Sequence, residues 1–329
     1  MTDRAIVSSL YNSMKLPTIV APMFLISGPD LVIAAAKAGI IGCFPTPNAR
    51  TINDLEEWLE KIKSELKGTK QEGMWAINMI VHKSYDRFEA EMALVERYKP
   101  KFVVTALGSP TRVLDRVHAF GGKVFADVIN MEQAKKAIAA GVDGLILVCS
   151  GAGGHTGKYS PFSFVEEVRR FYDGPLIVGG AMQSARSIAA LIALGADFAY
   201  MGTRFISCPE SLVVDEYREM LVSSSMDDVV TSDVVSGVMA NWLKASLSKA
   251  GFDLKSKKGS TEIDFSDIQG EGKAWKDTWG AGHGVSATQN IETVKEIVDS
   301  LVDEFALLQP SLANELSRWP KHSEDNKND

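Results

Sequence analysis

The chain has 329 residues, of which 45% are hydrophobic and 23% are charged, and its formal net charge is −7. This length and composition are those of a globular protein with a sizeable core, built as one large α/β barrel or as two smaller domains. The acidic balance argues against a nucleic-acid-binding protein, which carries a basic patch or stripe. No apolar run reaches the length of a membrane-spanning helix. We therefore expect neither a nucleic-acid partner nor a membrane partner.

The three cysteines, Cys43, Cys149 and Cys208, are widely spaced, and none belongs to a CxxC pair. This pattern is typical of reduced thiols in an intracellular protein. The first residues, 1–15, lack the apolar core and small-residue cleavage site of a signal peptide. Together these features predict a cytoplasmic protein.

Short apolar segments alternate with helical stretches through the first two thirds of the chain. The predicted strands are 18–21, 40–44, 75–80, 102–105, 123–128, 144–149, 175–178 and 198–201. The predicted helices are 29–38, 52–66, 87–97, 111–120, 131–140, 164–171 and 185–194, with a last one at 290–307. Eight strand–helix units in series favour a TIM (β/α)8 barrel over a doubly wound sheet, which usually has about five or six strands.

Two helix-to-strand turns have the same form, Gly141-Val142-Asp143 and Gly195-Ala196-Asp197. Such turns lie at the N-terminal face of a barrel, where unusual residues serve stability and not catalysis. We therefore predict that Asp143 and Asp197 are structural.

The pattern changes after the eighth predicted strand. Residues 209–254 are predicted to be helical, and residues 255–273 are polar and contain glycines. Together they form a segment that is too long for a simple loop. We expect a barrel of residues 1–207 and 275–312, with a small, mainly helical insertion of residues 208–274 over its C-terminal face. Residues 313–329 end in a polar run and are predicted to be a flexible tail.

The most unusual loop is Gly151-Ala152-Gly153-Gly154-His155-Thr156-Gly157, directly after the sixth predicted strand. Its glycines let the backbone approach a ligand closely, because no Cβ atoms stand in the way. His155 carries the side chain best suited to move protons near neutral pH. The loop is either an active site over a flat cofactor or a tight turn with an exposed histidine.

Other polar or glycine residues stand at the predicted strand ends, where the active site of a barrel lies. Gly179-Gly180 and Gly202-Thr203 end adjacent strands and predict a phosphate site, since bare backbone N–H groups and a hydroxyl converge there. Asn78 is polar within an apolar strand, and its carboxamide either binds the edge of a flavin ring or bonds backbone. Asp127 either accepts a hydrogen bond from a ribityl hydroxyl or pairs with a nearby base.

Several other chemistries have no support in the sequence. The five histidines show no HxxH or HxxxH spacing, so we predict no protein-bound metal. The Gly-x-Ser-x-Gly elbow of hydrolases is absent. Cys149 lies near His155 in the sequence and is either a core cysteine or part of a Cys–His pair.

These motifs, taken in order, resemble those of the nitronate monooxygenase family, formerly called 2-nitropropane dioxygenases. They are Ala21-Pro22-Met23, Asn78, Ala152-Gly153-Gly154-His155, Gly179-Gly180-Ala181, Met201-Gly202-Thr203-Arg204-Phe205 and Trp279-Gly280-Ala281-Gly282-His283-Gly284. The resemblance implies an FMN-dependent barrel with an inserted helical domain. The family also includes flavin-dependent enoyl-ACP reductases and NADH:quinone reductases, so the resemblance specifies the cofactor more closely than the reaction.

The resemblance also implies roles for particular residues. The backbone of Ala21, Pro22 and Met23 would pack under the isoalloxazine ring, and Asn78 would bond the polar edge of that ring. Ala152 and Gly153 would face the ring near N5, with His155 as the catalytic base. Gly180, Gly202 and Thr203 would bind the phosphate. The further candidate cofactor contacts are Asp127, Ser150, Gly179, Met201, Gly282 and His283.

The chain departs from the family pattern in two places. It has Ala281-Gly282-His283 where the family often has Ala-Gly-Gln, and residues 236–241 lack the arginines of the family's Gly-Arg-Pro-Ala-Arg segment. Apart from these departures, the resemblance implies FMN-dependent oxidation of alkyl nitronates, and of nitroalkanes, with O2. The alternatives are an NAD(P)H-dependent flavin reductase of quinones or enoyl thioesters and a non-catalytic flavin-binding barrel. We expect the protein to be a monomer or a homodimer.

Overall fold

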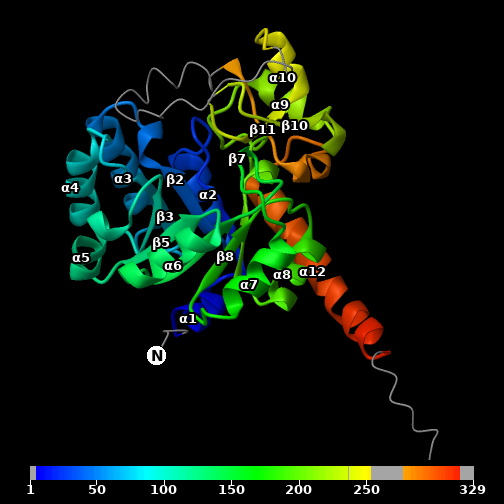
Figure 1. Ribbon diagram of the computed structural model, residues 1–329, viewed down its shortest axis with the longest axis horizontal. Coiled ribbons are helices and arrows are strands. Elements are labelled where there is room, and N and C mark those ends of the chain that lie inside the picture. Colours follow the sequence, from blue (N-terminus) through cyan, green and yellow to red (C-terminus); the bar gives the residue numbers. More distant parts are fainter. Residues whose placement is uncertain (1–4, 236, 253–276, 319–329) are drawn as a thin grey trace, which may run out of the picture.

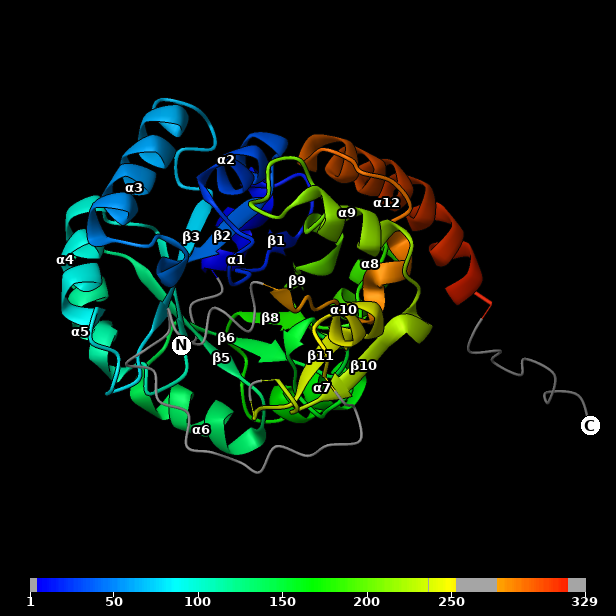
Figure 2. The ribbon, with the colours of Figure 1, turned by 90° about the horizontal axis from the view of Figure 1, so that it is seen from above.

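The computed structural model describes residues 5–235, 237–252 and 277–318. Its eight main strands are parallel and form a closed barrel in the order β1-β2-β3-β4-β5-β6-β8-β9 (Figures 1 and 2). They are β1 (Thr18–Val20), β2 (Ile41–Pro45), β3 (Trp75–Ile80), β4 (Phe102–Ala106), β5 (Lys123–Val128), β6 (Gly144–Val148), β8 (Leu176–Gly179) and β9 (Phe198–Met201). The predicted TIM barrel is confirmed, and each predicted strand is present.

The outer ring consists of helices that follow the strands. They are α2 (Pro29–Ala38), α3 (Ile52–Leu66), α4 (Phe88–Tyr98), α5 (Thr111–Ala119), α6 (Met131–Ala140), α7 (Pro161–Arg169), α8 (Ala185–Leu194) and α12 (Val294–Leu316). Short 3-10 turns are η1 (Thr46–Asn48), η2 (Thr203–Phe205), η3 (Met226–Asp228) and η5 (His283–Ala287). Helix α3 illustrates how the sequence sets these helices. Thr51 and Asp54 form a capping box at its start, and its buried residues recur at helical spacing, at Leu55, Leu59, Ile62 and Leu66.

The sequence did not predict α1 (Ala5–Ser13), which closes the N-terminal end of the barrel (Figure 1). Leu10 from α1 lines a small apolar cavity inside the barrel together with Phe102 and Phe198. The Tyr11 hydroxyl donates to the carbonyl of Asp197 at 2.8 Å, and its ring lies 5.4 Å from that of Phe198. The helix therefore shields the lower barrel core from solvent.

The insertion contains strands as well as helices, so the prediction of helix throughout residues 209–254 is wrong in two places. It comprises α9 (Asp215–Val222), β10 (Val229–Ser232), β11 (Ala240–Leu243) and α10 (Lys244–Lys249). The β-branched run Val229-Val230-Thr231 favours a strand, and it pairs antiparallel with β11. Strand β11 then pairs with β7 (Gly154–His155), which belongs to the loop after β6. The polar segment 255–273 lies outside the described residues.

The predicted flexible tail begins too early in the chain. Helix α12 continues to Leu316 with Pro310 inside it, so residues 313–316 are helical. Its last buried residue is Leu308, so the apolar pattern ends before the helical backbone does. Residues 319–329 lie outside the described part of the chain.

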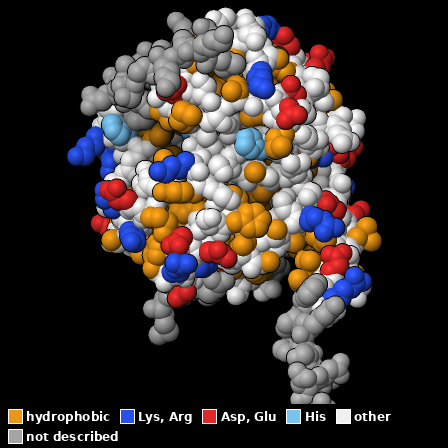
Figure 3. All heavy atoms as spheres, turned by 45° about the vertical axis from the view of Figure 1, so that its right-hand side comes forward, with side chains coloured by type: hydrophobic (Ala, Val, Ile, Leu, Met, Phe, Trp, Pro, Cys, Tyr) orange, Lys and Arg blue, Asp and Glu red, His pale blue; other side chains and the backbone are white. Residues whose placement is uncertain are grey.

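None of the helices in the described part of the chain is both long and apolar enough to cross a membrane. On the face drawn in Figure 3, acidic and basic side chains lie interspersed among hydrophobic ones, and no basic stripe is visible on that face.

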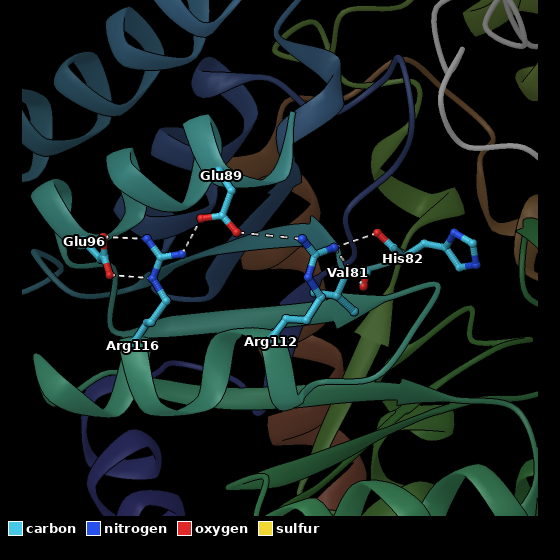
Figure 4. A network of polar contacts seen from close by, with 6 residues as sticks. All are labelled: Val81, His82, Glu89, Glu96, Arg112 and Arg116. Atoms are coloured by element: carbon cyan, nitrogen blue, oxygen red, sulfur yellow. Dashed lines mark hydrogen bonds and ion pairs between the residues drawn. The ribbon is translucent and has the colours of Figure 1, made fainter. Parts of the chain in front are cut away.

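Ion pairs between α4 and α5 anchor the segment that follows β3 (Figure 4). Arg116 bonds Glu96 through Nε at 2.7 Å and Glu89 through Nη1 at 2.8 Å. Arg112 donates to the carbonyl of His82 at 2.7 Å, and its guanidinium lies 3.6 Å from the centre of the Phe88 ring. These contacts fix the chain as it leaves β3 at the C-terminal face.

Asp143 and Asp197 are structural, as predicted. Asp143 accepts from the backbone N–H of Val124 and pairs with Lys123, each at 2.9 Å. The carboxylate of Asp197 is buried and accepts from Arg169 at 2.8 Å and from the N–H of Leu176 at 2.9 Å. Both carboxylates thus join a helix-to-strand turn to the start of a neighbouring strand.

Replacing Asp197 with Ala should strongly destabilise the fold, because it removes the buried carboxylate partner of the half-buried Arg169 guanidinium and leaves the N–H of Leu176 without its acceptor. We expect a loss of about 3 kcal/mol in the free energy of unfolding, measured by urea denaturation. The control is Glu132→Ala, since Glu132 forms only an exposed pair with Lys136. Equal denaturation midpoints for the two variants would contradict this structural role.

Candidate active site

The carbonyl of Gly151 joins three segments of the chain at the C-terminal face. It accepts from the N–H of Ala181, in the loop after β8, at 3.2 Å, and from the N–H of His283, in the C-terminal segment, at 2.9 Å. Gly151 itself has a φ of +81°, a conformation that favours glycine. The predicted motifs around residues 151, 181 and 283 therefore converge at one point.

Glycines allow these segments to approach one another. A Cβ at Gly282 would lie 2.4 Å from the carbonyl oxygen of Gly151, and one at Gly153 would lie 2.9 Å from the nitrogen of Gly282. A Cβ at Gly180 would lie 2.8 Å from the carbonyl oxygen of Ser150. Part of the glycine pattern is thus required by contacts between backbones, whereas the sequence pattern indicated only a ligand or a tight turn.

The ends of β9 and β1 lie side by side at this junction. The buried Thr203 hydroxyl oxygen accepts from the N–H of Gly282 at 2.9 Å, so its own hydrogen is the group it can donate. The N–H of Ala21 donates to the carbonyl of Met201 at 3.0 Å. A Cβ at Gly202 would lie 3.3 Å from the sulfur of Met23, so the two strand ends are in contact.

Asn48 holds the loop after β1, a role that the sequence reasoning missed. Its side-chain nitrogen donates to the carbonyls of Met23 at 2.9 Å and Ser27 at 2.7 Å. Its side-chain oxygen accepts from the N–H of Leu25 at 2.8 Å. The only signal in the sequence is a polar residue shortly after the second strand, which does not identify its distant partners.

His155 lies on β7, opposite Ala240 of the insertion. The side chain of His155 is exposed at the surface of the described part of the chain, although neighbouring protein atoms partly desolvate its ring. This desolvation lowers the pKa of His155 below its ordinary value, because it disfavours the charged imidazolium. The neutral imidazole that prevails near pH 7 is the form that accepts a proton.

Asn78 and Asp127 face the barrel interior below this junction. Alternate residues of a strand share a face, and Ala76 and Phe125 line the interior cavity, so Asn78 and Asp127 point inward one step nearer the C-terminal ends. Within the described residues, Asn78 Nδ2 and Asp127 Oδ1 are buried and have no hydrogen-bond partner. Burial raises the pKa of Asp127 to about 7.

Two further groups lie beside Asp127 in the same interior layer, the Cys43 thiol and the Tyr200 hydroxyl. Burial is the main cause that raises the pKa of each, and the nearby Asp127 adds to it. Cys149 is also buried, with its pKa raised to about 12 by desolvation, which supports the core-cysteine interpretation over a reactive Cys–His pair.

The predicted residues thus fall into two groups. The residues of the loops after β1, β6, β8 and β9 are linked to one another and to the C-terminal segment by direct contacts. Asn78 and Asp127 stand apart from these contacts, within the barrel beneath. Across the ranges 5–235, 237–252 and 277–318, no three His, Cys, Asp or Glu side chains come together as metal ligands could.

Comparisons with known proteins agree with this arrangement. The family model for nitronate monooxygenase matches residues 44–304. A nitronate monooxygenase of Paraburkholderia phytofirmans is 28% identical over 190 residues, which cover 54% of this chain and 52% of that protein. A (3aS,4S,5R,7aS)-5-hydroxy-7a-methyl-1-oxo-octahydro-1H-indene-4-carboxyl-CoA dehydrogenase of Rhodococcus jostii is 26% identical over 222 residues, 68% of this chain and 61% of that protein. The match thus spans about half to three fifths of each relative's length.

Two solved structures share the fold over nearly the whole chain. FabK from Thermotoga maritima has a TM-score of 0.78 at 23% identity and covers 94% of this chain and 98% of its own. Nitroalkane oxidase from Streptomyces ansochromogenes has a TM-score of 0.78 at 20% identity and covers 92% of this chain and 99% of its own. The family match extends over most of the barrel and the insertion, and the chain belongs to the nitronate monooxygenase family of flavin-dependent oxidoreductases.

Proposed function

We propose that this protein binds FMN and oxidises alkyl nitronates with O2, with His155 as the catalytic base for neutral nitroalkanes. The observation that carries the proposal is the position of His155. Its imidazole has a lowered pKa and stands on a glycine-rich loop joined by hydrogen bonds to the segment after β8 and to the C-terminal segment. A small-molecule substrate and O2 are the partners this implies, and the cytoplasm is the compartment that its reduced thiols suit.

The residues present fit a flavin. The carboxamide of Asn78 and the carboxyl of Asp127 each have a buried polar atom without a partner among the described residues, and such atoms are costly unless a ligand satisfies them. The alternating donors and acceptors of a flavin ring edge and its ribityl hydroxyls match them. When bound, the flavin would supply the redox chemistry, while the protein orients the substrate.

The phosphate of FMN would lie where β8 and β9 end. The hydroxyl hydrogen of Thr203 and the glycine backbone at Gly179, Gly180 and Gly202 form the kind of surface that accepts one terminal phosphate. The segment from Ala21 to Met23 lies against Gly202 and would support the ring from beneath. Ser150, Ala152, Gly153, Met201, Gly282 and His283 would complete the contacts.

His155 would act on the substrate as a general base. A neutral nitroalkane must lose its α-proton before it can give up electrons, and a neutral imidazole can take that proton. A nitronate has already lost it. His155 would therefore matter more for nitroalkanes than for nitronates.

One observation favours a second candidate, an oxidoreductase of acyl or enoyl thioesters. The Rhodococcus jostii relative, which aligns with 68% of this chain, is named as a carboxyl-CoA dehydrogenase. The segment that follows β10 also lacks the arginines of the family's insertion. A thioester substrate would use the same flavin site but would require a nicotinamide or another electron carrier in place of the nitronate.

The purified protein should be yellow and should release FMN on heating. A Cβ at Gly202 would already lie 3.3 Å from the sulfur of Met23 at the barrel mouth, so Gly202→Leu should lower flavin occupancy, with Ser64→Leu as a control because Ser64 is an exposed residue of α3. Chromatography of the released cofactor and its absorbance identify and count the flavin. Recovery of FAD, or failure of the apoprotein to bind FMN, would contradict the proposal.

Replacing His155 with Asn should reduce turnover of a neutral nitroalkane by ~10²–10⁴-fold, the usual effect of a lost general base. Oxidation of propyl-2-nitronate should fall less, and FMN should stay bound. Because the pKa of His155 is lowered, the wild-type rate with nitroalkane should stay level from about pH 8 to 7 and decline only at more acidic pH, below the ordinary histidine value of about 6.5.

Anaerobic mixing of the same protein with nitronate and, separately, with NADH tests the choice of reaction. Flavin reduction by nitronate and little by NADH is the expected result. Rapid bleaching by NADH followed by reoxidation with a quinone or enoyl thioester would favour the second candidate.

Asp127 should make the FMN-free protein less stable at alkaline pH. Its pKa is raised in the folded state, so its contribution to stability is full below its ordinary value near 3.8 and is lost as the pH rises through about 7. Asp127→Asn cannot ionise, so its Tm should rise relative to wild type between about pH 5 and 8. Asp303→Asn, at an exposed site, should show no such trend. A Tm difference that does not change with pH would contradict this account of Asp127.

A further inference from the structure

Asn241 is a polar residue at a fully buried position in the middle of β11. Its neighbours in the strand, Ala240 and Trp242, are also fully buried. A buried carboxamide costs free energy unless its donors and acceptor are satisfied. An apolar residue would have been the simpler choice for packing, so the contacts of Asn241 explain its presence.

Its side chain forms one bond to each of two segments. The nitrogen Nδ2 donates to the carbonyl of Ala152 at 2.7 Å, and the oxygen Oδ1 accepts from the hydroxyl of Thr231 at 2.5 Å. A backbone carbonyl can only accept, so the nitrogen must face Ala152. Asn241 therefore connects the hairpin of the insertion with the loop that carries His155.

Backbone pairing strengthens the same connection (Figure 1, β7 beside β11). Asn241 pairs with Gly154, and Ala240 pairs with His155. A Cβ at Gly280 would lie 2.7 Å from the carbonyl oxygen of Asn241, so the C-terminal segment also passes directly against β11. The hairpin of the insertion therefore contacts residues 152–155 through the side chain of Asn241 and through the pairing of β11 with β7.

We propose that Asn241 is a positioning residue for His155, and that the hairpin β10–β11 is a fixed part of the active centre. Asn241 acts through the backbone of Ala152 and Gly154 and does not itself touch the substrate. The sequence predicts only that the insertion lies over the C-terminal face of the barrel. In this view its hairpin also sets the geometry of the loop that carries His155. The role of His155 in turnover rests on the proposed function, whereas the effect on loop geometry does not.

The substitution Asn241→Asp isolates the bond to Ala152. Aspartate has nearly the same shape, and Thr231 can still donate to it, but an ionised carboxylate has no proton for the carbonyl of Ala152. When protonated at lower pH, the carboxyl can donate that bond again. The matched control is Thr231→Val, which removes the other bond and leaves the one to Ala152 in place.

Hydrogen exchange of the holoprotein, followed by mass spectrometry and normalised to wild type at each pH, gives the readout. At about pH 8, Asn241→Asp should increase exchange about tenfold in peptides covering 150–157, the effect of one lost buried hydrogen bond, with little change in β1 to β5. The increase should diminish towards about pH 5.5. Thr231→Val should affect peptides covering 229–235 and not those covering 150–157.

Turnover supplies a second readout that depends on the proposed function. With a neutral nitroalkane, Asn241→Asp should lower kcat at pH 8 about tenfold or more with a small change in KM, and the loss should diminish as the pH falls. Unchanged exchange at 150–157 in Asn241→Asp, or equal increases there in both variants, would overturn the proposal. An exchange effect without any nitroalkane or nitronate turnover would uphold the positioning role and contradict the proposed substrate.

A variant that does not fold at pH 8 still leaves a test. Asn241→Ala carries no charge and also lacks the donor to Ala152, so it should show the same exchange increase at 150–157 but without recovery at lower pH. Recovery of the Ala variant at about pH 5.5 would contradict the protonation argument and with it the assigned bond.

Discussion

The architecture of the C-terminal face depends on a single backbone carbonyl, that of Gly151. Two N–H groups from segments 30 and 132 residues away in sequence, at Ala181 and His283, donate to it. Both contacts require the backbones to lie directly against each other. A Cβ at Gly282 would be 2.4 Å from the carbonyl oxygen of Gly151, so no side chain fits there. The glycines of this junction are therefore a packing requirement first, and any surface that they offer to a cofactor is a consequence of that packing.

Beneath this junction, the side chains that line the barrel interior change from polar to apolar. Its lower interior is lined by apolar side chains and closed by α1, whereas the layer above contains Asn78, Asp127 and the Cys43 thiol. Polar atoms at such positions reduce the stability of the flavin-free fold, since no group in the part of the chain that the structure describes satisfies Asn78 Nδ2 or Asp127 Oδ1. Binding of a flavin that satisfies them would recover that free energy, which couples the stability of the fold to occupancy.

The sequence predicted the barrel well because each strand is a compact apolar run followed by a clear helix pattern. It missed α1, whose role depends on covering the end of a barrel that does not exist until the chain has folded. It also missed β10 and β11. Strand β11 pairs with β7, which joins residues more than 80 positions apart. For the site, the glycines and the histidine after the strands identified segments that the structure brings into contact. Asn48 and Asn241 were not recognised, because the role of each depends on a hydrogen bond to a backbone carbonyl far away in the sequence.

The sheet that joins β7 to β11 crosses the boundary at which the insertion would be cut in a comparison of sequences. One of its strands belongs to the barrel and two belong to the insertion. Exchanging insertions between relatives, to transfer specificity, therefore separates strands that must match in register. A chimaera is expected to retain its fold only if the donor supplies the segment 152–156 together with 229–243. The segment to exchange between relatives is therefore the whole sheet, and not the insertion alone.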